Sequence, residues 1–236
     1  MDLSLTNILG VLVVIVILYL LYNYFFGSAK QTLAMMKDAK TSYTVPATTL
    51  APGQSADYTY SIWLYVDEWN YRFGEEKVVF QRQDAQGDPA PKVSLAPSVN
   101  NLEVVVSTYP DSNSNNVIQQ KCNISDIPIQ SWTNIILALS NRALDVYVDG
   151  RLVRTCVLPG VPKAAGTAGI VVTPGGGFSG YTSKFEYLPY AVNPQEAYSI
   201  YTEGNGSGSV LGGIFDKYQV KLAFVEDNRE VHSIEI

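Results

Sequence analysis

Residues 131–158 constrain the fold more than any other stretch of the chain. An apolar run at residues 132–139 is followed by residues 144–148, in which apolar and polar side chains alternate with a period of two. Asp149-Gly150 is a two-residue turn of the kind that needs positive φ, so the chain should return antiparallel after it. The pattern predicts a three-strand meander with one buried face, with Trp132 in the core and a second sheet covering that face.

The composition favours an all-β domain with many turns. The chain has 236 residues, among them 16 Tyr, 18 Gly and 12 Pro, and only 16% of the residues are charged. This length allows one sizeable domain with appendages. The net charge of −6 argues against a nucleic-acid partner, which needs a basic surface. The single histidine, His232, removes most histidine-based chemistry.

Two cysteines, Cys122 and Cys156, are too few for a disulfide scaffold or for a structural zinc site. They can form one bridge between neighbouring strands, or they can remain two buried thiols. The residue pattern leaves both alternatives open.

Residues 8–26 form an uncharged run dominated by Leu, Ile and Val. At about 1.5 Å rise per residue, a helix of this length spans roughly 28 Å, close to the thickness of a bilayer core. Asp2 and the lack of a basic residue before the run distinguish it from a signal peptide. The run therefore predicts a single membrane-spanning anchor. Residues that mark its length are Ile8, Leu12, Ile15, Leu18, Tyr22 and Phe26.

The charges that flank this run predict its orientation. No basic residue precedes it, whereas Lys30, Lys37 and Lys40 follow it. The positive-inside rule then places the rest of the chain in the cytosol. A cytosolic domain keeps its thiols reduced, and it leaves the two sequons at Asn123 and Asn205 without glycans.

The segments along the chain predict four regions. Residues 1–27 are the anchor, and residues 28–56, rich in helix formers and then in Pro and Gly, are a helical stalk and connector. Residues 57–204 hold a β-sandwich, with a short helix near its end that has Pro194 in the first turn. Residues 205–236 are a glycine-rich linker and a terminal β-hairpin around Asp227-Asn228.

Several stretches of the chain resemble the laminin-G-like branch of the concanavalin A-like lectin/glucanase jelly rolls. They are residues 61–67 (SIWLYVD), Trp132, residues 144–153 (LDVYVDGRLV), residues 178–180 and residues 193–201. The resemblance covers residues 57–204. It implies an all-β fold, a two-sheet jelly-roll sandwich, and it leaves the function open, because this fold serves lectins, hydrolases and interaction modules.

The anchor and three further stretches are similar to membrane-anchored proteins of this fold from large icosahedral DNA viruses of algae. The stretches are residues 152–163, 173–187 and 211–224. This resemblance implies a minor capsid protein that ties the inner viral membrane to the capsid shell, with the globular domain facing the capsid. The implied partners are the lipid bilayer and other capsid proteins, and self-association is a further interaction of this kind.

The alternative function is a membrane-displayed lectin that binds a cell-wall or surface glycan. Its support is the fold together with Trp69, Tyr71 and Phe73, which follow the expected strand at residues 58–67 in one loop. Aromatic rings in a loop can stack on a sugar or dock into a protein neighbour. These three residues therefore form the candidate interaction loop.

The sequence favours binding over catalysis. Glucanases of this superfamily use a Glu-x-Asp-x-Glu string, and this string does not occur here. Glu75-Glu76 would face opposite sides of a strand, and Asp145 and Asp149 flank a turn. We therefore expect no enzyme activity, no metal and no cofactor. A calcium site is not defined by the spacing of the four loop acids Asp67, Glu68, Asp84 and Asp88.

Overall fold

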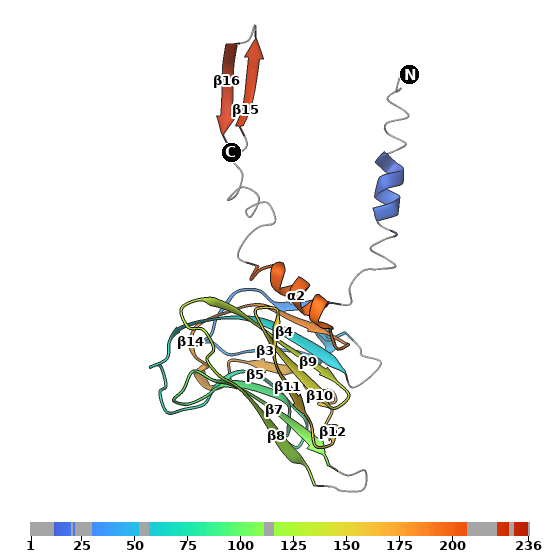
Figure 1. The fold of residues 1–236 in the computed structure, drawn as a ribbon, viewed down its shortest axis with the longest axis vertical. Helices are drawn as coiled ribbons and strands as arrows, with labels where there is room; N and C mark the ends of the chain where they lie inside the picture. The colour runs from blue at the N-terminus through green and yellow to red at the C-terminus, as the bar shows by residue number, and fades with distance from the viewer. Residues whose placement is uncertain are drawn as a thin grey trace. The chain divides into compact units, whose positions relative to one another are not determined.

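The chain forms two compact units, Met1–Lys30 and Gln31–Ile236. The structure is a computed structural model, and it describes residues 12–19, 21, 30–51, 57–110, 116–206, 221–226 and 229–235 (Figure 1). The N-terminal unit is helical at residues 12–19, and the larger unit holds the β-sandwich.

The expected anchor falls partly on the described residues. Three of its marker residues lie in the helix at residues 12–19 and are 57–60% exposed: Leu12, Ile15 and Leu18. The other three, Ile8, Tyr22 and Phe26, lie outside the described residues. Within the part of the chain that the structure describes, no helix is long and apolar enough to cross a bilayer.

The larger unit is a sandwich of two antiparallel seven-stranded sheets, which confirms the all-β fold class (Figure 1). In the first sheet the order is β1-β14-β4-β9-β10-β11, and β2 also pairs with β14. Its strands are β1 (Gln31–Ala34), β2 (Lys37–Asp38), β4 (Tyr58–Glu68), β9 (Trp132–Ser140), β10 (Ala143–Val148), β11 (Arg151–Val157) and β14 (Ser179–Leu188).

In the second sheet the order is β12-β7-β6-β5-β13-β3, and β8 also pairs with β7. Its strands are β3 (Tyr43–Val45), β5 (Lys77–Gln83), β6 (Pro89–Leu95), β7 (Leu102–Tyr109), β8 (Ile118–Ile124), β12 (Val161–Pro162) and β13 (Ile170–Val172). Two 3-10 turns, η1 (Ala47–Thr49) and η2 (Pro174–Gly176), connect strands of the sandwich.

Alternate residues of the strands fill the core between the sheets, as the period-two pattern predicts. Tyr60 and Ile62 of β4 are each 1% exposed, and Phe80 of β5 is fully buried. The ring of Phe80 lies 5.3 Å from that of Tyr60 and 4.9 Å from that of Phe185 on β14. Each buried aromatic side chain of this kind stabilises the fold by about 1.5–3 kcal/mol.

The expected meander is confirmed as β9, β10 and β11, which are neighbours in the first sheet. Asp149 has φ 50° and Gly150 has φ 71°, as the two-residue turn requires. The meander does not bury one whole face, however. Every residue of β11 except the half-buried Cys156 is exposed, because β11 ends the sheet and lies beyond most of the core.

The predicted helical stalk at residues 28–56 is wrong for its described part. Residues 31–34 and 37–38 form β1 and β2, which pair with β14, and residues 43–45 form β3, which pairs with β13. Leu33 and Tyr43 pack against the core of the sandwich. The cross-strand pairing and this burial outweigh the weak helix propensity of the segment. The compact unit therefore begins at Gln31, before the expected boundary at residue 57.

The expected short helix is confirmed as α2 (Pro194–Thr202). Asn193 caps it in a capping box with Glu196, and Pro194 stands in its first turn. Its buried residues Ala197 and Ile200 form a second apolar cluster, which lies on the outer face of the first sheet. The other members of that cluster are Ile136, Ala138, Tyr147, Leu188 and Val192.

The predicted terminal hairpin is also confirmed. β15 (Lys221–Glu226) pairs antiparallel with β16 (Arg229–Glu235) in a separate two-stranded sheet. The turn at Asp227-Asn228 lies outside the described residues, as does most of the glycine-rich linker, residues 207–220.

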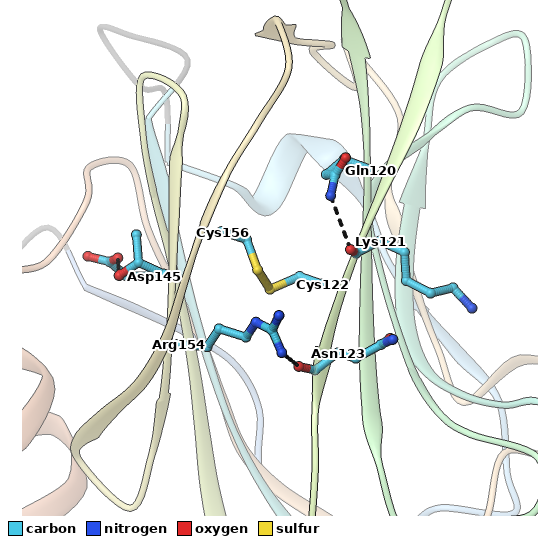
Figure 2. Close-up of a disulfide and its surroundings, with 8 residues drawn as sticks. Gln120, Lys121, Cys122, Asn123, Asp145, Arg154 and Cys156 are labelled. Atoms are coloured by element: carbon cyan, nitrogen blue, oxygen red, sulfur yellow. Dashed lines mark hydrogen bonds between the residues drawn. A yellow bond between two sulfur atoms is a disulfide. The ribbon is translucent and has the colours of Figure 1, made fainter.

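Cys122 and Cys156 are joined in a disulfide, with their Cα atoms 6.1 Å apart. Cys122 lies on β8 and Cys156 on β11, so the bridge links the two sheets rather than neighbouring strands of one sheet (Figure 2). Arg154 Nη1 also reaches across and donates to the Asn123 carbonyl at 2.8 Å (Figure 2). The strand β8, which the sequence pattern did not predict, thus closes one side of the sandwich together with β11.

We expect the disulfide to stabilise the sandwich by about 4 kcal/mol, because it closes a loop of 34 residues in the unfolded chain. The double substitution Cys122→Ala, Cys156→Ala should lower the free energy of unfolding by this amount in urea denaturation followed by tryptophan fluorescence. Reductant should destabilise the natural chain to the same extent and leave the double variant unchanged. Equal midpoints for all samples would contradict the expectation.

Candidate binding surfaces

The candidate interaction loop is not a free aromatic platform. Trp69 packs against the core, and the Lys77 ammonium lies 5.1 Å from its ring centre. Tyr71 donates a hydrogen bond from its hydroxyl to the Gly176 carbonyl at 3.1 Å, and this bond fixes the loop to η2. Phe73 is 61% exposed. Two of the three predicted residues therefore hold the loop in place, and Phe73 is the one that faces solvent.

A different set of aromatic residues is brought together on the first sheet. Tyr181 on β14 lies directly opposite Tyr65 on β4, and Tyr65 lies directly opposite Trp132 on β9. The rings of Tyr65 and Trp132 are 5.6 Å apart. Tyr181 is 45% exposed, and the other two side chains are half-buried. We call Tyr181, Tyr65 and Trp132 the aromatic row.

The aromatic row lies on the outer face of the sheet, so the predicted core position of Trp132 is wrong. On β9, Ile135 and Leu137 belong to the core between the sheets, whereas Ile136 belongs to the outer cluster. Trp132 is four residues before Ile136 on the same strand, so both side chains lie on the same face, and Trp132 points outward. The alternation in residues 61–67 shows in the same way that Tyr65 and its two neighbours point to opposite faces of the strand. The sequence does not show which of these two faces packs against the second sheet.

The helix α2 extends the aromatic surface beside the row. Tyr201 of α2 stacks on Trp63 of β4, with ring centres 5.6 Å apart and planes inclined by 20°. Trp63 is two residues from Tyr65 on the same strand and therefore lies on the same face. A Cβ atom at Gly150 would stand 3.1 Å from Tyr198 Cα. Gly150 thus serves both the positive φ of its turn and the close approach of α2.

The strand β11 forms a second surface at the edge of the same sheet. It has seven residues and pairs on one side with β10. Leu152 and Val153 are each 48% exposed, and Val157 is 71% exposed. An edge strand with exposed apolar side chains offers both unpaired backbone groups and apolar contact to a partner strand.

Two of the four loop acids considered for calcium are brought together around a lysine. Lys163 Nζ pairs with Asp84, and it lies 2.6 Å from Asp88 Oδ2. The lysine lowers the pKa of Asp84, and the hydrogen bonds to Asp84 and Asp88 raise the pKa of Lys163. The Lys163 ammonium therefore stands where a bound cation would, so these acids do not fit calcium. Asp67 and Glu68 lie apart from them, at the exposed end of β4.

The acids considered for catalysis are engaged in local structure. Asp145 Oδ1 accepts a hydrogen bond from Thr155 at 2.6 Å, and Asp149 Oδ1 accepts one from the Asn134 backbone at 2.8 Å. Glu75 pairs with Arg72. Among the residues that the structure describes, no group of three or more His, Cys, Asp or Glu side chains could hold a metal ion.

A cleft with both polar and apolar lining opens between the sheets at one end of the sandwich. It has a volume of about 180 Å³ and is lined by Tyr58, Tyr187 and Arg82 among others. Burial raises the pKa of Tyr58 well above its ordinary value and that of Tyr60 to about 12, although the Arg82 charge opposes the rise. Arg82 donates to the carbonyls of Ala168 and Gly166, so its main contacts fix the loop that forms one wall.

This architecture defines the class of the protein: a two-sheet antiparallel jelly-roll of the laminin G and concanavalin A type. A family model described as concanavalin A-like lectin/glucanases superfamily (Laminin_G_3) matches residues 37–197, which is more than half of the chain. The chain belongs to this family. Among curated proteins, no sequence match is found.

Solved structures share the fold at low sequence identity. The binding domain of Paraclostridial Mosquitocidal Protein 1 is 16% identical, with a TM-score of 0.53 over 75% of this chain and 46% of that one. The botulinum neurotoxin serotype D binding domain is 8% identical, with a TM-score of 0.55 over 74% and 44%. The same serotype D domain in complex with N-acetylneuraminic acid is 11% identical, with a TM-score of 0.52 over 74% and 42%. The chain thus spans less than half the length of these structures.

The position of Trp132 predicts that its removal leaves the fold intact. We expect Trp132→Ala to cost about 1 kcal/mol, the loss of one partly exposed aromatic pair. Phe185→Ala should cost about 3–5 kcal/mol, because Phe185 is 1% exposed in the core. Thermal melts followed by circular dichroism compare the two variants. A Trp132→Ala variant that melts as low as Phe185→Ala would contradict the outward placement of Trp132.

Proposed function

We propose that this chain is a non-catalytic, membrane-anchored structural protein of a virion, a minor capsid protein whose sandwich tethers the inner viral membrane to the capsid shell. The observation that carries the binding role is the edge strand β11, on which Leu152, Val153 and Val157 are exposed. The viral setting is supported by the resemblance of the anchor and of residues 152–163, 173–187 and 211–224 to virion proteins of algal viruses.

The edge of β11 suits a protein partner. Its outer backbone groups can add one strand of a partner to the sheet, and Leu152, Val153 and Val157 supply apolar contact. A capsid protein strand is the occupant we propose. Many anchored copies on one membrane would make weak individual contacts sufficient through avidity.

The anchor is supported by the exposed apolar helix of the N-terminal unit. All eight side chains at residues 12–19 are exposed, and each is Leu, Val, Ile or Tyr. The lysines that follow favour a cytosolic sandwich, whereas the Cys122–Cys156 disulfide favours an oxidising compartment. The two indications oppose each other, so the orientation of the sandwich decides between the candidate functions.

The second candidate function is a membrane-displayed lectin. It is favoured by the aromatic row and by the family, and one solved structure with the same fold contains N-acetylneuraminic acid. A lectin of this kind would display its sandwich outside the cell, where the disulfide forms and glycans are met.

We expect Leu152→Lys with Val153→Lys to weaken binding of the major capsid protein of the same virus by about tenfold or more, because charges on an edge strand block strand addition. The measurement is co-flotation of that capsid protein with liposomes carrying the full-length chain. Val99→Lys, at a residue 53% exposed in the loop between β6 and β7, is the matched control and should bind normally. Unchanged flotation with the β11 variant would refute the edge contact. Dimers that disappear in the β11 variant would instead identify a second copy as the occupant.

Protease protection of the full-length chain in sealed vesicles tests the orientation. A cytosolic sandwich should be digested from outside and carry no glycan on Asn123, which is exposed on β8. A protected sandwich with a glycan on Asn123 would reverse the orientation and replace the tether with the lectin. Mass spectrometry of the same sample reads the glycan and the Cys122–Cys156 bridge together.

A further inference from the structure

The strand β11 is held weakly along its own length. Among the described residues it pairs with β10 alone, and the register of that pairing shifts so that Val153 has no opposite residue. None of the seven residues of β11 is buried, although Cys156 packs against the core. Burial of apolar side chains, which fixes the central strands, therefore contributes little to the position of β11.

Both ends of β11 are fixed by contacts outside the strand. Before it, the Asp149 backbone N–H donates to the Asn134 carbonyl at 2.9 Å, and Asp149 Oδ1 accepts from the Asn134 N–H at 2.8 Å. After it, the N–H of the buried Leu158 donates to the Arg142 carbonyl at 2.7 Å, and the Arg142 guanidinium donates back to the Leu158 carbonyl. The middle of the strand lies between these two fixed points.

The middle of β11 is joined to β8 by the Cys122–Cys156 disulfide and by the hydrogen bond from Arg154 to the Asn123 carbonyl (Figure 2). The Cα atoms of the two cysteines are 6.1 Å apart, whereas facing sheets usually lie about 10 Å apart. The two sheets therefore converge at this edge, and the bridge holds them there. From this placement we propose that the Cys122–Cys156 pair is a redox switch: the disulfide fixes the middle of β11 for a partner strand, and reduction releases it.

The switch acts on the contact proposed for β11, so its effect on binding rests on that proposed function. A partner strand binds more tightly to an edge that is already ordered, because ordering a loose strand costs free energy on binding. The switch also accounts for the two opposing indications of compartment. The lysines after the N-terminal apolar run favour a cytosolic sandwich with reduced thiols, and the disulfide then forms when the sandwich meets an oxidising environment. Oxidation strengthens the tether after assembly.

Exchange with glutathione disulfide supplies the chemistry, and Cys156 is the cysteine that reacts first. Cys156 is half-buried, whereas Cys122 is 1% exposed. The Cys156 thiolate attacks one sulfur of glutathione disulfide, which forms a mixed disulfide and releases one glutathione. The Cys122 thiolate then attacks the Cys156 sulfur and releases the second glutathione. Two protein thiols are oxidised, one glutathione disulfide is reduced, and the two cysteine protons pass through solvent to the two glutathione thiolates.

Hydrogen exchange of the full-length chain in nanodiscs, followed by mass spectrometry, tests the switch without a partner. The chain is equilibrated with glutathione or with glutathione disulfide, and thiol alkylation measures the oxidised fraction. We expect the exchange rate of β11 amides, divided by that of β10 amides, to rise about tenfold or more on reduction, because local opening frees β11 alone. The ratio cancels any change in the stability of the whole sandwich. Cys122→Ser with Cys156→Ser should show the reduced ratio in both buffers.

Two outcomes of this experiment would overturn the proposal. An unchanged ratio would show that the bridge stabilises the sandwich as a whole and does not control β11. A bridge that stays oxidised in excess glutathione would show that the pair is a permanent structural disulfide.

Co-flotation of the capsid protein with liposomes that carry the full-length chain tests the consequence for binding. We expect flotation to be about tenfold or more weaker with the reduced chain and with the double serine variant. Circular dichroism at the assay temperature checks that every sample is folded. Equal flotation in both redox states would refute control of the contact by the bridge. Absence of flotation in both states would refute the tether itself, and the exchange ratio would still decide the switch, so the two failures are distinguishable.

Discussion

Burial of the two facing sheet surfaces is the interaction on which the rest of the structure depends. Tyr60, Phe80 and Phe185 meet at the centre of this contact. Once Tyr60 and Ile62 face inward, the pleat forces Trp63 and Tyr65 outward, because successive residues of a strand point to opposite faces. A slip of one residue would exchange the two sets, so the core also fixes the aromatic surface of the first sheet.

The central strands and their turns could be predicted from the sequence, and the edges could not. Residues 132–157 show both the alternation and the Asp149-Gly150 turn, and the structure follows them closely. The edge strands β1 and β2 are short and lie in a segment of helix formers, and their conformation is decided by pairing with β14, which is 140 residues or more away in the chain. Local propensity carries no information about such a distant partner.

The binding surfaces were predicted less well than the fold, for a related reason. The Trp69–Phe73 loop shows its aromatic residues in one stretch of sequence, but their exposure depends on contacts with Lys77 and Gly176. The aromatic row is the reverse case. Its members are separated by 67 residues between Tyr65 and Trp132 and by 49 between Trp132 and Tyr181, and only the registers of β14, β4 and β9 bring them into line.

Lys163 supplies the loop between β5 and β6 with a positive charge. In a metal-dependent protein of the same shape, a bound cation would supply that charge. Its ammonium is covalently part of the chain and is held by Asp84 and Asp88. The charge that organises this loop cannot be diluted away or removed by a chelator. The form of this region therefore does not depend on a bound cation to balance Asp84 and Asp88.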